Sequence, residues 1–199
     1  MLDIEIFSVE TPIYASGKKI GAIPHLSLGS YTQPTQNDQK IIDRFDKELT
    51  PEKKDAFASK ITRLGQTYFA SSLAQAIEES HHPIVRQKML NILKNVYTDP
   101  FDTPESLLAQ QQQILQTLHG QFRPTHMVAM MIQMKKAHDQ QVAENKVSPI
   151  QDEIFARGIA KCVQSIQDLP EKEKTPQIKR FCKRSTHRWK NLDYSTVRS

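Results

Sequence analysis

The sequence predicts an all-α protein, a bundle of about six or seven helices with a small N-terminal β-hairpin. Apolar residues recur at steps of three and four along most of the chain, which is the period of an amphipathic helix. A Ser or Thr followed directly by Pro predicts a helix start. The Ser or Thr side chain accepts a hydrogen bond from a first-turn amide, and proline, which has no N–H, leaves no donor unsatisfied in that turn. These pairs are Thr50-Pro51, Thr103-Pro104, Ser148-Pro149 and Thr175-Pro176.

The helical body is expected to span residues 37–169, with its first helix capped by Asn37 or Asp38. The segment 127–134 is apolar nearly all round, which is typical of a central helix surrounded by others. The four glutamines at 110–113 are interpreted as solvated helix surface. Three regions follow from this pattern, namely 1–36, 37–169 and 170–199.

Residues 1–36 form the predicted hairpin and a loop that leads into the body. Two short apolar runs, 13–15 and 20–23, flank the polar turn sequence 16–19, as expected for two strands joined by a tight turn. Prolines at 12 and 24 confine such strands to sheet edges, because proline has no N–H to donate to a neighbouring strand.

Composition and cysteine usage indicate an intracellular globular protein. Of 199 residues, 38% are hydrophobic and 25% are charged, which is ordinary for a folded domain. Cys162 and Cys182 fall on the apolar sides of predicted helices, so we expect buried free thiols in a reducing compartment. Acids stand at positions 3 and 5, where a secretion signal carries Lys or Arg, and no apolar run is long enough to span a membrane. We therefore expect a cytoplasmic location.

The positive charge is concentrated at the C-terminus. The whole chain has a net charge of +5. Residues 170–199 contain nine Lys or Arg and three Asp or Glu, a net of +6, whereas residues 1–169 contain 18 and 19, a net of −1. Any attraction to an anionic partner is therefore expected to come from the last segment.

This last segment has the pattern of a basic amphipathic helix. Its apolar residues, which begin at Ile178 and include Phe181 and Cys182, fall within an arc of about 100° at helical steps. Basic residues fill most of the remaining circumference, and a tryptophan stands on the apolar side. The candidate partner-binding residues are Lys179, Arg180, Lys183, Arg184, Arg188, Trp189 and Lys190.

Three kinds of partner fit this pattern. An acidic protein surface needs only complementary charge, and an anionic membrane would also engage Trp189 and Phe181 at the headgroup level. Nucleic acid would be attracted by the same cations, but no helix-turn-helix, zinc-finger or RNA-binding motif accompanies them. The alternative is that the apolar stripe docks onto the bundle and the cations are merely solvated. The leading hypothesis is a non-enzymatic interaction protein.

No motif predicts catalysis or a cofactor. The sequence 16–19 contains a Gly-Lys pair, but a phosphate-binding loop would need a glycine at Pro12 and a hydroxyl at Lys19. The alternative to an interaction protein is a hydrolase or transferase with a Cys, His and acid site assembled from separate helices. Basic neighbours would lower the pKa of Cys182, although His187 lies about 140° around the helix from it. We predict no catalytic residue.

The segment 78–82, Glu-Glu-Ser-His-His, contains two overlapping Glu-x-x-His spacings. On a helix this spacing brings a carboxylate and an imidazole to one metal, but a di-iron bundle needs a second copy that the sequence lacks. Pro83 ends the helix, so His81 and His82 are predicted to cap its C-terminus, where the helix dipole favours them. We predict no metal site.

The C-terminal tail carries one resemblance. The chain is rich in Gln and Lys, has no enzyme motif, and ends in the polar segment 193–199 with Val197 third from the end. In these respects it resembles effector proteins secreted by the type IV systems of intracellular bacteria, of the Dot/Icm kind. It departs from their tails in having no glutamate after Glu173. The resemblance implies delivery into a host cell and binding of a host protein or membrane, without a particular activity.

Overall fold

The computed structural model describes residues 4, 6–28, 36–96, 99 and 101–189, and side chains only as far as Cys182. The predicted fold class is confirmed: the described residues form seven α-helices and one antiparallel hairpin. The elements are β1 (Ile6–Ala15), β2 (Lys18–Leu28), α1 (Gln36–Phe45), α2 (Pro51–Glu79), α3 (Pro83–Val96), α4 (Pro104–Gln121), α5 (Pro124–Ala143), α6 (Pro149–Gln167), the 3-10 turn η1 (Glu171–Glu173) and α7 (Pro176–Trp189).

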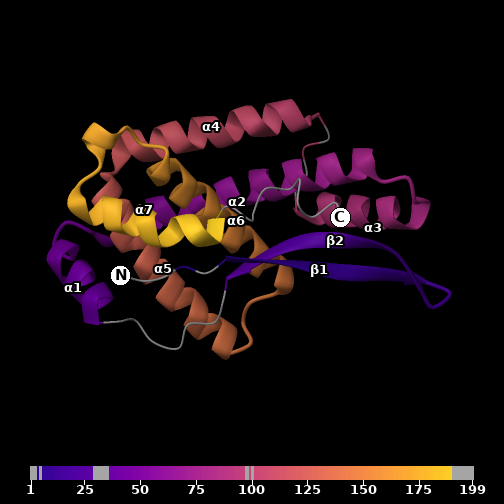
Figure 1. Cartoon of the computed structure of the whole chain (residues 1–199), viewed down its shortest axis with the longest axis horizontal. Coiled ribbons are helices and arrows are strands. Elements are labelled where there is room, and N and C mark those ends of the chain that lie inside the picture. The colour runs from indigo at the N-terminus through magenta and orange to yellow at the C-terminus, as the bar shows by residue number, and fades with distance from the viewer. Residues whose placement is uncertain (1–3, 5, 29–35, 97–98, 100, 190–199) are drawn as a thin grey trace.

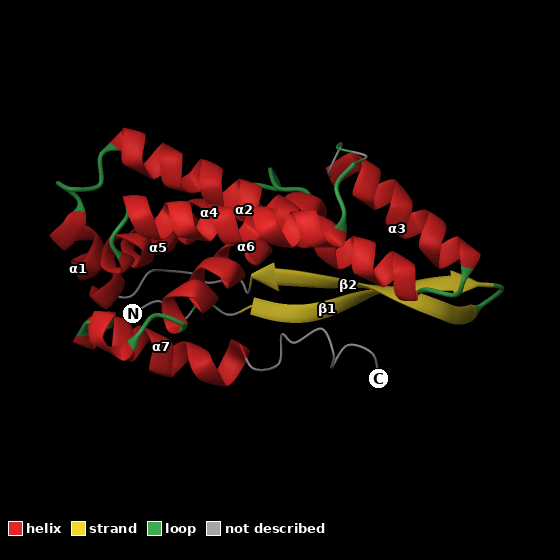
Figure 2. Ribbon diagram, turned by 90° about the horizontal axis from the view of Figure 1, so that it is seen from above, coloured by secondary structure: helices red, strands yellow, loops and turns green. Residues whose placement is uncertain are grey.

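The long helix α2 is the centre of the arrangement and packs against α3, α4 and α6. The hairpin runs along the bundle beside α6, with α3 near its turn and with α1 and α7 near the opposite end of the molecule (Figure 1). Figure 1 also shows α4 along the edge of the bundle opposite the hairpin, and Figure 2, turned by 90°, shows α1 and α7 at the end of the molecule away from the hairpin turn. The hairpin therefore lines one side of the helical body rather than closing an end.

The Thr-Pro and Ser-Pro pairs start helices as predicted. Thr50, Thr103 and Ser148 are N-caps that accept hydrogen bonds from first-turn amides, and a proline follows each. Thr175 plays the same part at α7, where its Oγ1 accepts from the N–H of Ile178 at 3.3 Å. The predicted cap of the first helix is wrong, because α1 begins at Gln36 and both Asn37 and Asp38 lie inside it.

The hairpin is longer than the apolar runs indicated. Its strands pair in register from Ile6 opposite Leu28 to Ala15 opposite Lys18, with one irregularity after Ile13. The turn contains only Ser16 and Gly17, both with positive φ, as a two-residue hairpin turn requires. Much of β1 is exposed and polar, so its alternation of buried and exposed residues is too weak to mark the full strand in the sequence.

Two glycines allow α2 and α6 to touch at the backbone. A Cβ atom on Gly65 would lie 1.9 Å from the carbonyl oxygen of Ile154, and a Cβ on Gly158 would lie 2.3 Å from the carbonyl oxygen of Ile61. Real Cβ atoms do not approach an oxygen so closely, because the overlap is strongly repulsive. Any larger residue at either position would force the two helices apart.

The apolar core has two parts. The larger part is built around α5, whose segment 127–132 is buried as predicted. The smaller part joins Ile13 and Ile23 of the hairpin to α2 and α3.

The prediction that residues 110–113 form solvated helix surface is wrong for Gln111, which is buried. Its Nε2 donates hydrogen bonds to the carbonyl oxygen of Thr67 at 3.2 Å and to Ser71 Oγ at 2.9 Å. A buried amide is tolerated when its hydrogen bonds are satisfied.

We expect Gly65→Ala to lower the free energy of unfolding by about 2 kcal/mol or more, because the new methyl group overlaps the α6 backbone. Gly120→Ala in α4 is the control, since a Cβ there meets no atom within 4 Å. It should raise stability by about 0.5 kcal/mol through helix propensity alone. Urea unfolding of both variants checks this, and equal stability of the two would refute the backbone contact.

Candidate functional site

The first half of α7 has the amphipathic arrangement that the sequence predicts. Ile178 and Phe181 are only 1% and 2% exposed, and they belong with Cys182 to the larger core, where α7 packs against α5 and α6. Lys179 and Arg180 are exposed. The apolar stripe thus docks onto the bundle, and the cations described on this helix face solvent.

The protein's own acids neutralise these cations only in part. Glu171 Oε1 lies 3.1 Å from Lys174 Nζ, and Glu171 Oε2 lies 3.8 Å from Lys179 Nζ. The hydrogen bond from Lys174 lowers the pKa of the Glu171 carboxyl. Arg180 makes no ion pair with another described residue. The α7 backbone continues to Trp189. The remaining predicted contacts, made by the side chains of Lys183, Arg184, Arg188, Trp189 and Lys190, lie outside the described residues.

Burial of Phe181 corrects one expectation. A side chain that is 2% exposed and packed in the protein's own core has no surface to insert between lipid headgroups while α7 stays docked. No described helix combines the length and the apolar character needed to traverse a bilayer. The expected membrane anchor at Phe181 is therefore wrong for the folded chain.

The cysteines do not behave as activated nucleophiles. Burial raises the pKa of the Cys182 thiol, and this effect is larger than the opposing effect of the Lys174 charge. The thiol of Cys162, which is fully buried, has a pKa raised far above its usual range for the same reason. The expected lowering of the Cys182 pKa by basic neighbours is wrong, since a buried thiol resists ionisation.

One His–Ser pair joins α4 to α6. His119 Nε2 lies 2.9 Å from Ser165 Oγ, and burial lowers the pKa of the imidazole. Ser165 donates its hydroxyl hydrogen to the carbonyl oxygen of Cys162 at 2.6 Å, so the histidine nitrogen is the donor to Ser165. In this arrangement the imidazole cannot take the serine proton, and the pair acts as a structural bridge.

A buried ionic cluster ties the hairpin to α6 and α2. Glu153 accepts hydrogen bonds from His25 Nδ1, from the N–H of Leu26 at 3.3 Å and from Arg157 Nε at 2.8 Å. Arg157, which is completely buried, also donates to Ser72 Oγ at 2.9 Å and lies over the ring of Phe69. No pattern in the sequence predicts this cluster, because its members come from three separate elements.

A second set of charged residues joins α5 to α6. Lys135 is buried and donates to Asp139 one turn later, and burial lowers the pKa of its ammonium group more than the nearby acids raise it. His138 Nε2 lies 2.7 Å from Asp152 Oδ1, and its ring stacks on Phe155. The His138–Asp152 contact connects the last part of α5 to the first turn of α6.

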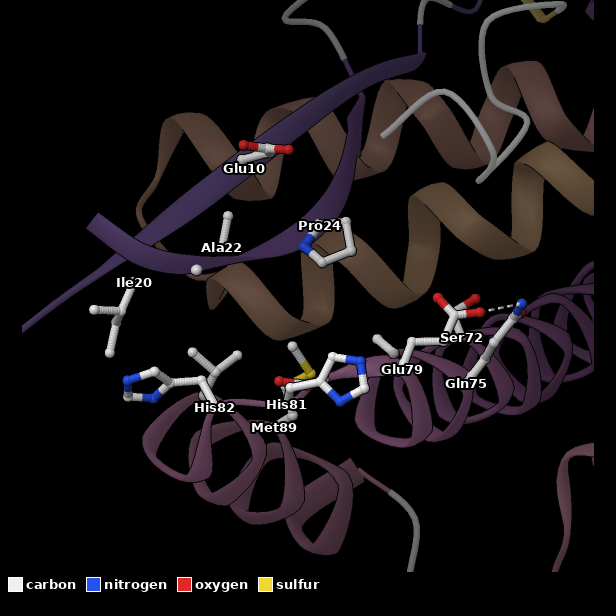
Figure 3. Close-up of a pocket in the computed structure, with 14 residues that line it drawn as sticks. Glu10, Ile20, Ala22, Pro24, Ser72, Gln75, Glu79, His81, His82 and Met89 are labelled. Carbon is white, nitrogen blue, oxygen red and sulfur yellow. Dashed lines mark hydrogen bonds between the residues drawn. The ribbon is translucent and has the colours of Figure 1, made fainter. Parts of the chain in front are cut away.

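A cavity of about 390 Å³ lies between the hairpin and the junction of α2 with α3. We call it the hairpin cavity. Its apolar lining includes Ile20, Val85 and Met89, while Glu10 lies on the hairpin side and Glu79 on the helix side (Figure 3). No motif in the sequence predicts this cavity, because its walls meet only when the hairpin folds back over α2 and α3.

His81 and His82 line this cavity. The C-cap of α2 is Ser80, whose N–H donates to the carbonyl oxygen of Ile77, and the carbonyl of His82 accepts from Arg86 in the first turn of α3. His82 Nδ1 is buried and has no hydrogen-bond partner among the described residues. The same part of the chain contains no group of three or more His, Cys, Asp or Glu residues able to hold a metal.

Comparison of the chain with protein families, curated proteins and solved structures found no match. We therefore infer function from the geometry of the chain itself.

We expect Arg157→Met to lower the free energy of unfolding by about 3–5 kcal/mol, because it leaves the Glu153 carboxylate buried without its cation. Urea unfolding measures this loss. In the double variant Glu153→Gln/Arg157→Met the uncompensated charge is gone, so part of the stability should return. A double variant that is as unstable as Arg157→Met, or less stable, would contradict the ion-pair interpretation.

Proposed function

We propose that this chain is a non-enzymatic interaction protein that binds an acidic protein surface through the outer face of α7. One observation carries the proposal: α7 buries Ile178 and Phe181 in the bundle while Lys179 and Arg180 remain exposed. The helix is held in place by its apolar side, so its cations are not needed for docking. Binding a partner would then require no rearrangement of the fold.

The length and charge of α7 favour an extended acidic protein surface as the binding partner over a small anion. Lys183, Arg184 and Arg188 follow Lys179 and Arg180 at helical steps of three and four in the sequence. A row of cations on one helix matches a row of carboxylates on a partner, and such complementarity speeds association and selects partners. The net charge of −1 in residues 1–169 leaves little internal demand for the +6 of residues 170–199.

An acidic protein is favoured over a membrane because the buried Phe181 side chain is not available for lipid. It is favoured over nucleic acid because the sequence contains none of the motifs that position a basic helix on a duplex or a single strand. From the resemblance to type IV-secreted effectors, we propose that this partner belongs to a host cell. That part of the proposal rests on the composition of the chain and on the sequence segment 193–199.

We expect Lys179→Glu/Arg180→Glu to weaken binding of the full chain to a poly-L-glutamate peptide by roughly tenfold at low salt, because two attractions become repulsions. Fluorescence anisotropy of the labelled peptide measures the dissociation constant. For the wild-type chain, binding should weaken steeply as salt rises, since mobile ions screen exposed charges.

The matched control is Lys88→Glu/Lys94→Glu, which makes the same charge change at exposed positions on α3. It should bind the peptide nearly as well as wild type. An equal loss in both double variants would show that only net charge matters and would overturn the proposal. Preferential binding of the wild type to phosphatidylserine-containing vesicles over the peptide would overturn it in favour of a membrane.

A further inference from the structure

A carboxylate of the protein's own chain already occupies part of the α7 surface. Glu171 begins η1, whose turn is closed by the hydrogen bond from the N–H of Lys174 to the carbonyl oxygen of Glu171 at 3.2 Å. The two carboxylate oxygens of Glu171 face two different lysines, Lys174 and Lys179. The hydrogen bond from Lys174 keeps the pKa of the Glu171 carboxyl below its ordinary value, so Glu171 is ionised at neutral pH. The two lysines therefore bind one carboxylate between them.

Lys174 is the more rigidly placed of these two lysines. Its side chain is only 11% exposed, whereas that of Lys179 is 55% exposed. Packing therefore restricts the conformations of Lys174 before a partner binds, and a restricted donor loses less entropy on binding than a free one. An ammonium group with so little exposure also needs an anion beside it, because water solvates it poorly.

Glu171, by contrast, is held only weakly. Its side chain is 75% exposed, and an exposed ion pair contributes little to stability because water and salt screen it. Among the described residues, the Glu171 side chain pairs only with Lys174 and Lys179. A carboxylate of a partner would make the same contacts, so the two acids would compete for one place.

We infer that Lys174 and Lys179 form a carboxylate-binding subsite of the α7 surface, and that Glu171 occupies it until an acidic partner takes its place. This inference rests on the proposed function and adds two features to it. Lys174 becomes a binding residue, although it precedes α7 in the chain and is mostly buried. Binding becomes an exchange of one carboxylate for another, which disfavours weakly acidic surfaces because a partner must first displace Glu171.

Fluorescence anisotropy of the full chain with labelled poly-L-glutamate tests the inference. We expect Glu171→Gln to tighten binding by roughly threefold at low salt, because it removes the competing charge and keeps a side chain of the same size. Glu173→Gln is the matched control, since it removes the same charge from the same turn, and Glu173 makes no ion pair with another described residue. It should bind within about 1.5-fold of wild type, because its charge acts on the peptide only through solvent.

Lys174→Met tests the subsite from its other side. It should weaken binding by roughly threefold, since a fixed donor to the partner's carboxylate is lost. In this background Glu171→Gln should tighten binding less than it does in the wild type, because Glu171 and Lys174 act through one contact. Thermal unfolding would verify that each variant folds, and the two Gln variants decide the question if Lys174→Met does not.

The measured affinities distinguish failure of the subsite from failure of the proposed function. Equal affinities of Glu171→Gln and Glu173→Gln, with the wild type binding, would overturn the subsite and leave the proposed function standing. If neither the wild type nor Glu171→Gln binds the peptide, both are overturned. Binding by Glu171→Gln without binding by the wild type would support the subsite and show that Glu171 blocks it.

Discussion

The backbone contact between α2 and α6 is the constraint on which the rest of the structure depends. Gly65 and Gly158 remove the side chains that would otherwise hold the helices apart. The close approach places Arg157 of α6 against Ser72 and Phe69 of α2, where its charge is buried and paired with Glu153. A buried ion pair is weak evidence of added stability. It does constrain the geometry, because a buried charge without its partner greatly destabilises the fold.

This geometry determines where the hairpin cavity and the α7 surface lie. Glu153 holds the β2 strand through His25 and the N–H of Leu26, so the hairpin is fixed beside α6 and its far half extends over the end of α2. The hairpin cavity is the space left between that half and the α2–α3 junction. At the other end of the molecule, α7 packs on α5 and α6, and its described cations Lys179 and Arg180 are exposed. The hairpin cavity and the α7 surface thus lie on separate parts of the molecule.

Local signals were sufficient for much of the fold and for part of the site. Thr103 and Ser148 mark helix starts, because a capping residue and the proline after it act within one turn. Ile178 and Phe181 mark the docked face of α7, because amphipathicity is a property of a single helix. The burial of Gln111 and the cavity between the hairpin and α2 were not predictable in this way. Both arise from elements far apart in the sequence, and no periodicity within one segment encodes their meeting.

The most direct test of this account is a nuclear Overhauser measurement across the α2–α6 contact. The position of a Gly65 Cβ lies 3.1 Å from the backbone nitrogen of Gly158, so one Gly65 Hα must be close to the Gly158 amide proton. We predict a cross-peak between these two protons in the full-length chain. Its absence, with both resonances assigned and the protein folded, would show that the helices do not touch at the glycines and would contradict the arrangement of helices on which α7 packs.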